Sequence, residues 1–362
     1  MYARRVIRLA RPWIGDEEKE AVRQVLESGM LVMGARVQAF ESRLAERCGR
    51  RFAVAVSSGT AALELALEAI GVNEEKDAEV LVPALSWPSP AHAVARAGAT
   101  PVLYDVDADS WNGTSSGAAA AHSDRVRAVI AIDQFGMPAA DFGTGEANDV
   151  PLIVDAACSL GATVDGRPAA SRGLIACLSF HPRKLLTTGE GGACLTDDAA
   201  LADALRVLRD HGRGGGGFVR PAGNHRMTEM AAAMGLVQLD RLDTIVERRR
   251  ALAARYREAL SPARFQRPLR EGVIGNDQTF GILVGGRNEA VAALRAQGVE
   301  AGLLSFSMNR IGSLAGRFRA GSPSFEVAEE IVDRGMALPL HPLMTDRDQE
   351  TVITTFVEHF SA

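Results

Sequence analysis

From about residue 50 onward, the chain alternates short apolar runs rich in β-branched residues with longer stretches of helical character. Runs of the first kind predict strands, and the longer stretches predict the helices that connect them. Such alternation indicates a mostly parallel sheet with helices on both faces. The run Pro151-Leu152-Ile153-Val154 is apolar throughout, as a strand covered on both faces should be. The pattern therefore predicts an α/β fold.

Seven strands are predicted, and together they would form one sheet between helices: Phe52–Val56, Glu79–Val82, Pro101–Tyr104, Arg127–Ile132, Pro151–Val154, Leu174–Phe180 and Gly192–Leu195. Helices are predicted before and between these strands, over Asp16–Ser28, Ala35–Cys48, Ala61–Ile70, Pro90–Ala97 and Ala199–Asp210. Further along, the pattern predicts one long helix over Thr228–Leu260, a strand over Thr279–Val284, and helices over Arg287–Gln297 and Asp346–Phe360.

A chain of 362 residues is too long for one small core, so two structural units are expected. We expect a large domain over residues 1–245, which holds the seven-stranded sheet, and a smaller α+β domain over residues 246–362. Whether the helices before residue 50 pack with the large or the small domain is left open.

Charge and hydropathy exclude two classes of partner. No apolar run approaches the roughly 20 residues of a membrane helix, so no membrane association is expected. The net charge is −5, and no basic block suits a phosphate backbone, so no nucleic acid is expected either. The densest basic run, Arg248-Arg249-Arg250, is interpreted as a solvated helix face.

Cysteine and histidine spacing is informative as well. The four cysteines show no CxxC spacing, and three of them lie in apolar segments, which favours reduced thiols and a cytoplasmic location. The seven histidines show no HExxH or paired-ligand spacing, so no metal site is expected.

One lysine stands out. Only three lysines occur among the 40 basic residues, and Lys19 and Lys76 lie in charged runs. Lys184 instead follows an apolar strand and precedes Thr187-Thr188-Gly189-Glu190-Gly191-Gly192. Since arginine serves elsewhere as the surface cation, a primary amine at this position suggests Schiff-base chemistry, which a guanidinium cannot perform.

Two other features follow predicted strands, and ligands of open α/β sheets collect at such strand ends. Ser57-Ser58-Gly59-Thr60 opens a predicted helix, whose free N–H groups and dipole suit a phosphate, although such a turn can also simply cap the helix. Trp87 comes shortly after the next strand and can stack on a planar ring, although simple packing is the commoner role.

Asp155 and Ser179 complete the set. Asp155 ends an apolar strand, where its carboxylate can either cap a helix or keep a pyridine nitrogen protonated. Ser179 ends the strand before Lys184. A phosphate turn, an aromatic plate, a buried aspartate and a lysine off the surface are together what pyridoxal 5′-phosphate (PLP) requires of its protein.

The chain resembles the DegT/DnrJ/EryC1/StrS family of sugar aminotransferases, members of the aspartate aminotransferase superfamily with PLP fold type I. The resemblance runs from about Asp16 to Pro342. It is strongest in four blocks: Ser57-Ser58-Gly59-Thr60-Ala61-Ala62-Leu63, Val154-Asp155-Ala156-Ala157, Ser179-Phe180-His181-Pro182-Arg183-Lys184 with Thr187–Gly192, and Asn224-His225-Arg226-Met227-Thr228-Glu229.

The resemblance implies a role for each matching residue. Lys184 would form the Schiff base and move the proton, and Asp155 would pair with the pyridine nitrogen. The remaining cofactor contacts would be a stacking ring, backbone amides, a hydroxyl and an amide from the neighbouring subunit: Trp87, Gly59 with Thr60, Ser179 and Asn224. A homodimer with shared active sites follows from the last of these.

Three departures from the family pattern matter. Cys158 stands where the family commonly has Gln or His near the cofactor's 3′ oxygen, so it is expected only as a cofactor neighbour. The local segment Asp155-Ala156-Ala157-Cys158 offers no cation that would make this thiol reactive. His225 stands where an aromatic residue is usual, and the stretch Asp107–Val150 departs from the family's usual run.

The implied activity is a ping-pong transamination, with pyridoxamine phosphate as the intermediate form of the cofactor. Glutamate or glutamine would donate the amino group, and a keto sugar, nucleotide-linked by family analogy, would accept it. A mobile loop from Arg209 to Gly217 would lie beside the substrate, or would be a plain surface loop. Arg213, Arg220 and Arg226 are candidates for binding a substrate diphosphate.

Three alternatives stay open. A keto-cyclitol could be the acceptor, although relatives of that kind tend to have Gln where this chain has His181. A PLP-dependent sugar dehydratase is a second, although such relatives replace the Schiff-base lysine by histidine and this chain keeps Lys184. A non-catalytic PLP-binding regulator is the third.

Overall fold

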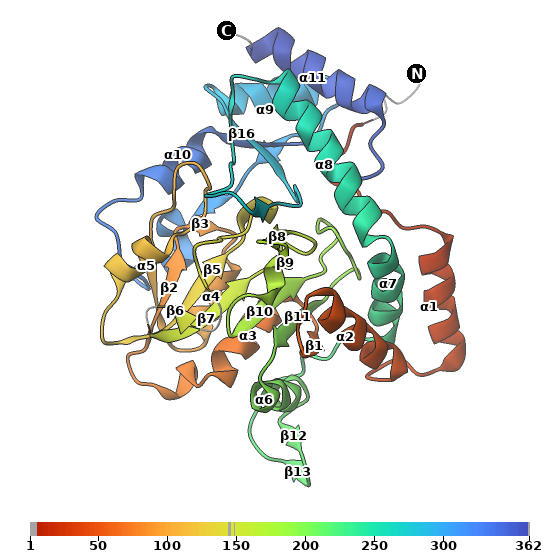
Figure 1. The fold of residues 1–362 in the computed structure, drawn as a ribbon, viewed down its shortest axis with the longest axis vertical. Coiled ribbons are helices and arrows are strands. Elements are labelled where there is room, and N and C mark those ends of the chain that lie inside the picture. The colour runs from red at the N-terminus through yellow and green to blue at the C-terminus, as the bar shows by residue number, and fades with distance from the viewer. Residues whose placement is uncertain (1–5, 144–145, 148, 361–362) are drawn as a thin grey trace.

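The computed structural model describes residues 6–143, 146–147 and 149–360 (Figure 1). Its α-helices are α1 Asp16–Ser28, α2 Ala35–Arg47, α3 Gly59–Ala69, α4 Ser89–Arg96, α5 Ser115–Ala121, α6 Ala199–Arg209, α7 Glu229–Asp240, α8 Leu242–Ala259, α9 Arg287–Ala296, α10 Glu326–Arg334 and α11 Asp346–Phe360.

The strands include seven of four residues or more in the first 200 residues: β1 Phe52–Val56, β2 Glu79–Pro83, β4 Thr100–Tyr104, β5 Val126–Ile132, β7 Val150–Asp155, β10 Ile175–Ser179 and β11 Gly192–Thr196. The others are β3 Leu85–Ser86, β6 Glu146–Ala147, β8 Thr163–Val164, β9 Arg167–Pro168, β12 Arg213–Gly214, β13 Gly217–Phe218, β14 Arg264–Phe265, β15 Val273–Ile274, β16 Phe280–Leu283, β17 Gly302–Leu303, β18 Phe306–Ser307, β19 Arg319–Ala320 and β20 Gly335–Leu338.

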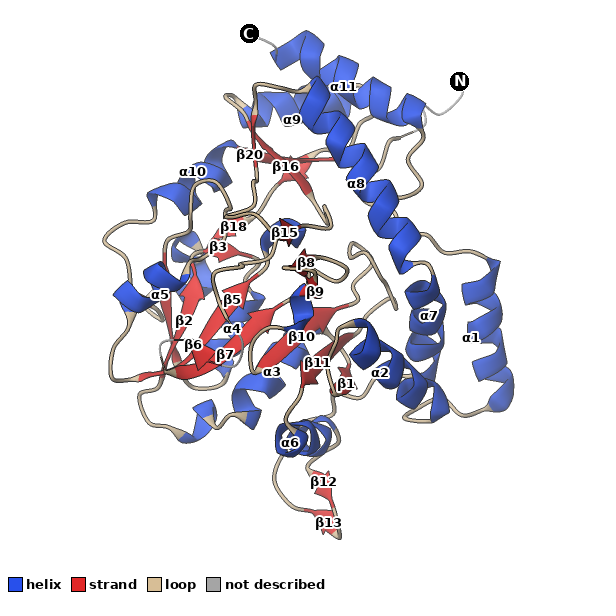
Figure 2. Cartoon of the chain, viewed as in Figure 1, coloured by secondary structure: helices blue, strands red, loops and turns tan. Residues whose placement is uncertain are grey.

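The central sheet has the strand order β1-β11-β10-β7-β5-β2-β4-β19, and β6 pairs with β7. β11 runs antiparallel to both of its neighbours, whereas the pairs from β10 to β19 are parallel. The prediction of an α/β fold with a mostly parallel sheet between helices is therefore confirmed, and all seven predicted strands lie in this sheet (Figure 2).

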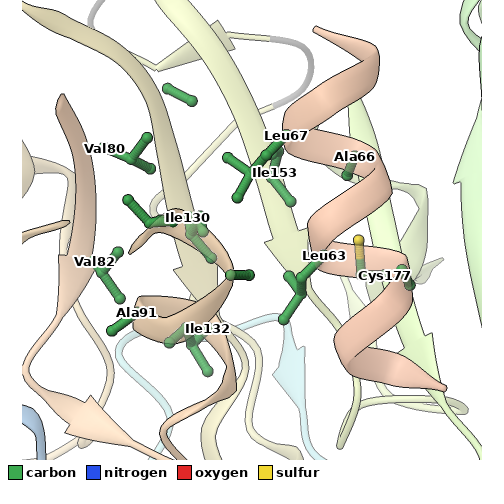
Figure 3. Packing of buried hydrophobic residues seen from close by; sticks show 14 of the residues in the cluster. Leu63, Ala66, Leu67, Val80, Val82, Ala91, Ile130, Ile132, Ile153 and Cys177 are labelled. Carbon is green, nitrogen blue, oxygen red and sulfur yellow. The ribbon is translucent and has the colours of Figure 1, made fainter. Parts of the chain in front are cut away.

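Both faces of the sheet are buried, because alternate residues of each strand enter different apolar clusters. On β5 and β7, Ile130 and Ile153 belong to a cluster that also contains Leu63 and Leu67 of α3 (Figure 3). Val129 on β5 faces the opposite cluster. This double burial accounts for the apolar character of the strands in the sequence.

The single long helix predicted over Thr228–Leu260 is wrong, because the structure has two helices, α7 and α8. The backbone N–H of Arg241 bonds to the carbonyl oxygens of Gln238 and Leu239, which interrupts the i→i−4 ladder. The side chains of Gln238 and Arg241 both donate to the carboxylate of Glu18 on α1, at 2.6 and 2.7 Å. Contacts of this tertiary kind leave no trace in helical periodicity.

The interpretation of Arg248-Arg249-Arg250 as a solvated helix face is also wrong. Arg249 is buried, and its Nε donates to the carbonyl oxygen of Asp277 at 3.1 Å. Arg248 and Arg250 donate to the carbonyl oxygens of Met344 and Gly275, at 2.8 and 2.9 Å. The three guanidinium groups thus tie α8 to chain segments that follow it.

The C-terminal part has its own sheet, of strand order β14-β16-β20-β17. Tyr256 of α8, Phe280 and Ile282 of β16, and Val352 of α11 share its core. It also reaches into the first part, since β18 pairs with β3 and β19 extends the central sheet beside β4. The two N-terminal helices α1 and α2 pack on α7. A division at residues 245/246 remains our proposal.

In the part of the chain that is described, no helix combines the length and the apolar character needed to span a bilayer.

Candidate active site

A cavity of about 580 Å³ lies at the carboxyl ends of the parallel strands. Its wall draws on the first part of the chain at 58–60, 86–90, 132–135, 155–158 and 179–184, and on the C-terminal part at 278–279, 302–306 and 337–340. Parallel strands bring their ends to one edge of the sheet, which is where ligands of open α/β sheets bind.

The structure brings seven of the eight predicted site residues to this cavity: Gly59, Thr60, Trp87, Asp155, Cys158, Ser179 and Lys184. Asn224 does not line it. Its side-chain oxygen accepts from Nε of Arg226 at 3.0 Å, and its backbone forms a bridge with Asp210. Asn224 therefore lies outside the cavity of its own chain.

The turn before α3 forms a tight cradle. Ser58 is the N-cap, and its hydroxyl accepts from the N–H of Ala61 at 3.1 Å, while the first turn of any helix leaves N–H groups without intrahelical partners. A Cβ on Gly59 would lie 2.7 Å from Cβ of Ser179, so only glycine allows this approach. The start of α3 at Gly59 and Thr60 therefore lies close to Ser179, and free N–H groups at a helix start suit an anion.

Asp155 ends β7 and is buried. Its Oδ1 accepts from the N–H of Ala157 at 3.1 Å, whereas no described residue is bonded to Oδ2. Burial, and to a lesser extent the charge of Asp133, raise the pKa of Asp155 to about 6, against the opposing effects of the Ala157 hydrogen bond and the Lys184 charge. This carboxylate is thus ready to accept an N–H donor from a ligand.

Lys184 lies in the loop after β10, and its Nζ donates to the sulfur of Cys158 at 3.0 Å. The sequence had indicated no cation near this thiol, because the lysine that supplies it is 26 residues away in the chain. Cys158 is partly exposed in the cavity wall, while Cys48, Cys177 and Cys194 are buried. All four are free thiols.

Trp87 lies at the cavity wall with 56% of its surface exposed. Phe306 packs edge-on against it, with ring centroids 5.5 Å apart. The guanidinium of Arg183 lies over the indole, 5.6 Å from its centroid. The planar indole ring of Trp87 is therefore held in place while much of its surface stays exposed.

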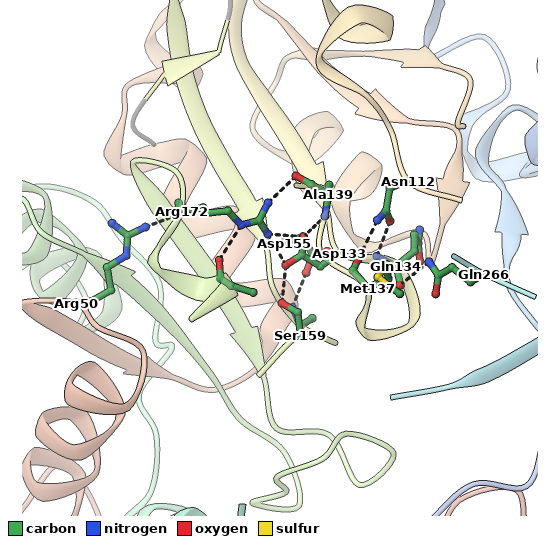
Figure 4. A network of polar contacts seen from close by, with 12 residues as sticks. Arg50, Asn112, Asp133, Gln134, Met137, Ala139, Asp155, Ser159, Arg172 and Gln266 are labelled. Carbon is green, nitrogen blue, oxygen red and sulfur yellow. Dashed lines mark hydrogen bonds and ion pairs between the residues drawn. The ribbon is translucent and has the colours of Figure 1, made fainter. Parts of the chain in front are cut away.

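A buried ion pair supports the cavity floor (Figure 4). Asp133 accepts from Arg172 at 2.6 and 2.7 Å and from the hydroxyl of Ser159 at 2.5 Å. Arg172 also donates to the carbonyl oxygen of Ala139, so both charges are fully paired. The network fixes the loop that follows β5 beside the loop that follows Asp155.

Sequence reasoning missed several residues in and beside the cavity. Asn276 is fully buried, and its side-chain amide donates to the carbonyl oxygens of Cys158 and Leu160, both at 2.8 Å. Gln278, two residues on, lines the cavity and donates to the carbonyl oxygen of Arg183. The hydroxyl of Ser89, at the start of α4, lies 2.9 Å from that of Thr60. Only the fold brings these residues together.

The predicted loop from Arg209 to Gly217 begins at the end of α6 and leads into the hairpin β12–β13, which projects below α6 in Figure 1. It does not line the cavity of its own chain, and neither do the three arginines predicted for a diphosphate. Arg220 pairs with Glu68 at 3.3 Å, and Arg226 pairs with Asp210 at 3.1 Å. Arg213 lies over the ring of Phe218.

A family model for the DegT/DnrJ/EryC1/StrS aminotransferase family matches residues 12–357 of the chain. Among solved structures, the aminotransferase TlmJ from Streptoalloteichus hindustanus is similar, with 31% identity, coverage of 96% of this chain and 97% of that one, and a TM-score of 0.89.

Two further solved structures have the same fold. S. venezuelae DesV in complex with a ketimine intermediate has 29% identity, coverage of 95% and 94%, and a TM-score of 0.87. The GDP-4-keto-6-deoxy-D-mannose-3-dehydratase of E. coli with bound hydrated PLP has 22% identity, coverage of 97% and 100%, and a TM-score of 0.88.

Proposed function

The chain belongs to the DegT/DnrJ/EryC1/StrS aminotransferase family, and from this premise we propose that it moves an amino group from glutamate or glutamine to a nucleotide-linked keto sugar. As a member of this family it is a PLP-dependent aminotransferase. The observation that carries the proposal is the meeting, in one cavity, of Lys184, Asp155 and the cradle formed by Gly59 and Ser179.

These residues fit PLP. The N–H groups of Gly59 and Thr60 and the hydroxyl of Ser179 would hold its phosphate, Asp155 its ring nitrogen, and Trp87 one face of its ring. Bound at Lys184, the cofactor supplies an electron sink for the negative charge that forms when a proton leaves the carbon bearing the amino group. The close approach of Gly59 to Ser179 supports this assignment, as does the open Oδ2 of Asp155.

The chain's own residues would handle the proton. Lys184 lines the cavity, and its Nζ would take the proton from the donor and return it to the acceptor. Cys158 would hold that amine when it is free, at the 3.0 Å contact seen here. Trp87 and Phe306 would cover the reacting atoms and limit access of water.

We also propose a homodimer with shared active sites, in the cytoplasm. An apolar patch supports it: Leu26, Met30, Leu31 and Val32 are exposed by 57, 62, 42 and 47%. Exposed apolar groups that cluster in this way usually mark a protein interface. Val32 forms a bridge with Thr228, four residues after Asn224, so the patch and Asn224 lie on connected backbone. Asn224 would then serve the cofactor of the second subunit.

The sugar dehydratase, the keto-cyclitol aminotransferase and the non-catalytic regulator remain the alternatives. Lys184 at the site argues against the dehydratase, since those relatives carry histidine there. The intact set of Lys184, Asp155 and Ser179 argues against the regulator, because all three groups that the reaction would need line the cavity.

The test is the absorbance spectrum of the purified protein with added PLP, before and after excess glutamate or glutamine, with Lys184→Ala in parallel. We expect a near-visible band that is lost on addition of the donor, and an altered band in the variant. Nucleotide-linked keto sugars would then be screened for recovery of the band. A band that ignores every donor would favour the dehydratase or the regulator, and absence of any band would overturn the assignment of PLP.

A further inference from the structure

Arg183 is the cavity-lining cation that none of the roles above employs. Its side chain is exposed at the mouth, and its guanidinium has no hydrogen-bond or ion-pair partner among the described residues. The cavity's other cationic side chain, Lys184, is bonded to Cys158, and the nearby Arg172 is paired with Asp133. Arg183 is therefore free to bind an anion from outside.

The position of Arg183 is nonetheless fixed. Its backbone N–H donates to Nδ1 of His181 at 3.2 Å, and its carbonyl oxygen accepts from the side chain of Gln278. Gln278 is itself buried, and its carbonyl oxygen accepts from the buried Arg249. The guanidinium lies over Trp87, which restricts the side chain without using any of its five N–H donors.

A guanidinium held in this way suits a phosphate group, because its fork of N–H donors matches phosphate oxygens in pairs. Glu190 also lines the cavity, but no ion pair joins it to Arg183 among the described residues. Of the arginines expected from the sequence for this task, Arg220 and Arg226 already have carboxylate partners in their own chain.

The volume of the cavity indicates which anion would reach Arg183. The cavity of about 580 Å³ must hold the cofactor and the sugar ring whose carbon reacts near Lys184. The remainder of a nucleotide-linked sugar must then extend past the mouth, where Trp87 and Arg183 lie. The carboxylate next to the reacting carbon of an amino-acid donor must instead stay deep, close to Lys184.

We propose that Arg183 is the residue that binds the diphosphate of the acceptor substrate, an inference that rests on the proposed function. The diphosphate lies against the guanidinium at the cavity mouth, and the indole of Trp87 keeps the guanidinium in place. The sugar then points inward to Lys184. Arg183 thus selects for acceptors that carry a nucleoside diphosphate and leaves the donor reaction unaffected.

The experiment measures binding of UDP, dTDP and GDP, and of the matching nucleosides, to the PLP-loaded protein by isothermal titration calorimetry. The variants are Arg183→Gln and Arg183→Lys, with Arg347→Gln as the matched control, since Arg347 is an exposed arginine on α11, away from the cavity. The glutamate- or glutamine-dependent loss of the cofactor band is recorded for each protein.

For the nucleoside diphosphate that binds best, Arg183→Gln should weaken binding by about 10- to 100-fold, the effect of losing a charge-assisted pair of hydrogen bonds. Arg183→Lys should lie between Arg183→Gln and the unchanged protein, because it keeps the charge but loses the fork. Nucleoside binding, the donor reaction and the Arg347→Gln control should be unchanged.

Three results would overturn the proposal. Diphosphate binding could be unaffected in Arg183→Gln, the loss could fall instead on the affinity for glutamate, or no nucleoside diphosphate could bind the unchanged protein while the donor reaction proceeds. The last result would leave the proposed transamination intact but would show that the acceptor does not carry a nucleoside diphosphate. Failure of the donor reaction itself in the unchanged protein would be a failure of the proposed function and not of the role of Arg183.

Discussion

At the scale of single residues, the carboxylate of Asp155 lies at a position where its charged form lowers the stability of the fold. Its carboxylate is buried at the end of an apolar strand, and burial disfavours its charged form. Among the residues that the structure describes, no cation is bonded to it. A carboxylate with a raised pKa and an open oxygen is what a protonated ring nitrogen needs as a partner.

The pH dependence follows from the direction of this shift. Burial raises the pKa of Asp155 from 3.8 to about 6, which is equivalent to about 3 kcal/mol. Between about pH 4 and pH 6 the unfolded chain releases this proton while the folded chain keeps it, so the free energy of unfolding falls as pH rises. Above about pH 6 the free energy of unfolding is lowered by the full amount of about 3 kcal/mol.

We therefore predict that Asp155→Asn raises the free energy of unfolding of the cofactor-free protein by up to about 3 kcal/mol at pH 8, and leaves it nearly unchanged at pH 4. The same variant should lose the donor reaction. Urea unfolding at both pH values measures the first effect, and Asp124→Asn, at an exposed position, is the control. Equal effects of Asp155→Asn at both pH values would contradict the prediction.

Much of the site's chemistry could be predicted from local sequence, because each strand end carries its own residue. Lys184, Asp155 and Ser179 could be found in this way. The contact between Lys184 and Cys158 could not, since it joins two loops whose distance is set by the sheet. Arg183 was passed over because its free guanidinium becomes informative only when its neighbours in space are known.

At the scale of elements, α2 depends on a residue from the start of α7. Glu229 is buried, and its carboxylate accepts from the N–H groups of Gly34, Arg36 and Val37 at 2.8, 2.9 and 2.9 Å. These are the donors that the first turn of a helix leaves free, and the negative charge also matches the helix dipole. One side chain thus fixes the start of α2 against α7.

Glu229→Ala should lower the free energy of unfolding by about 2–4 kcal/mol, because it leaves buried N–H groups without partners. Glu229→Gln should cost less, since it keeps one acceptor oxygen. Denaturant unfolding measures both, and Glu247→Gln, at an exposed position on α8, should stay within about 0.5 kcal/mol of the unchanged protein. A change of similar size in all three variants would show that the capping contacts are unimportant.

Elements differed in how far the sequence could predict them. The seven longer strands of the central sheet were predictable because burial on both faces makes most of their residues apolar. The two-residue strands β18 and β19 were not, since partners more than 200 residues away define them. The break between α7 and α8 depends on Glu18, and periodicity carries no record of such a contact.

At the scale of the whole molecule, the sharing of sites between subunits can be tested by mixing variants. Lys184→Ala removes the amine of one site, and Asn224→Ala removes the amide proposed to serve the other subunit. In a mixed dimer, the lysine of one subunit and the asparagine of the other complete one native site. Random mixing makes half of the dimers mixed, so about a quarter of the native activity should return.

The measurement is the rate of the donor reaction after the two inactive variants are unfolded together and refolded, compared with each variant refolded alone. Recovery requires that Asn224 acts across the subunit boundary. If Asn224 acted within its own chain, every site in the mixture would lack one of the two groups, and no activity would return.

Part of the cavity wall is formed by residues that come late in the chain, which has a consequence for protein synthesis. When a ribosome has added residue 245, all seven long strands and Lys184 exist, but Gln278 and the wall from Gly302 to Phe306 do not. At about 5–20 residues per second, several seconds pass before they follow. During that interval the amine of Lys184 lies at the carboxyl ends of the strands without the wall that later covers it. A complete site can therefore exist only after most of the chain has been synthesised.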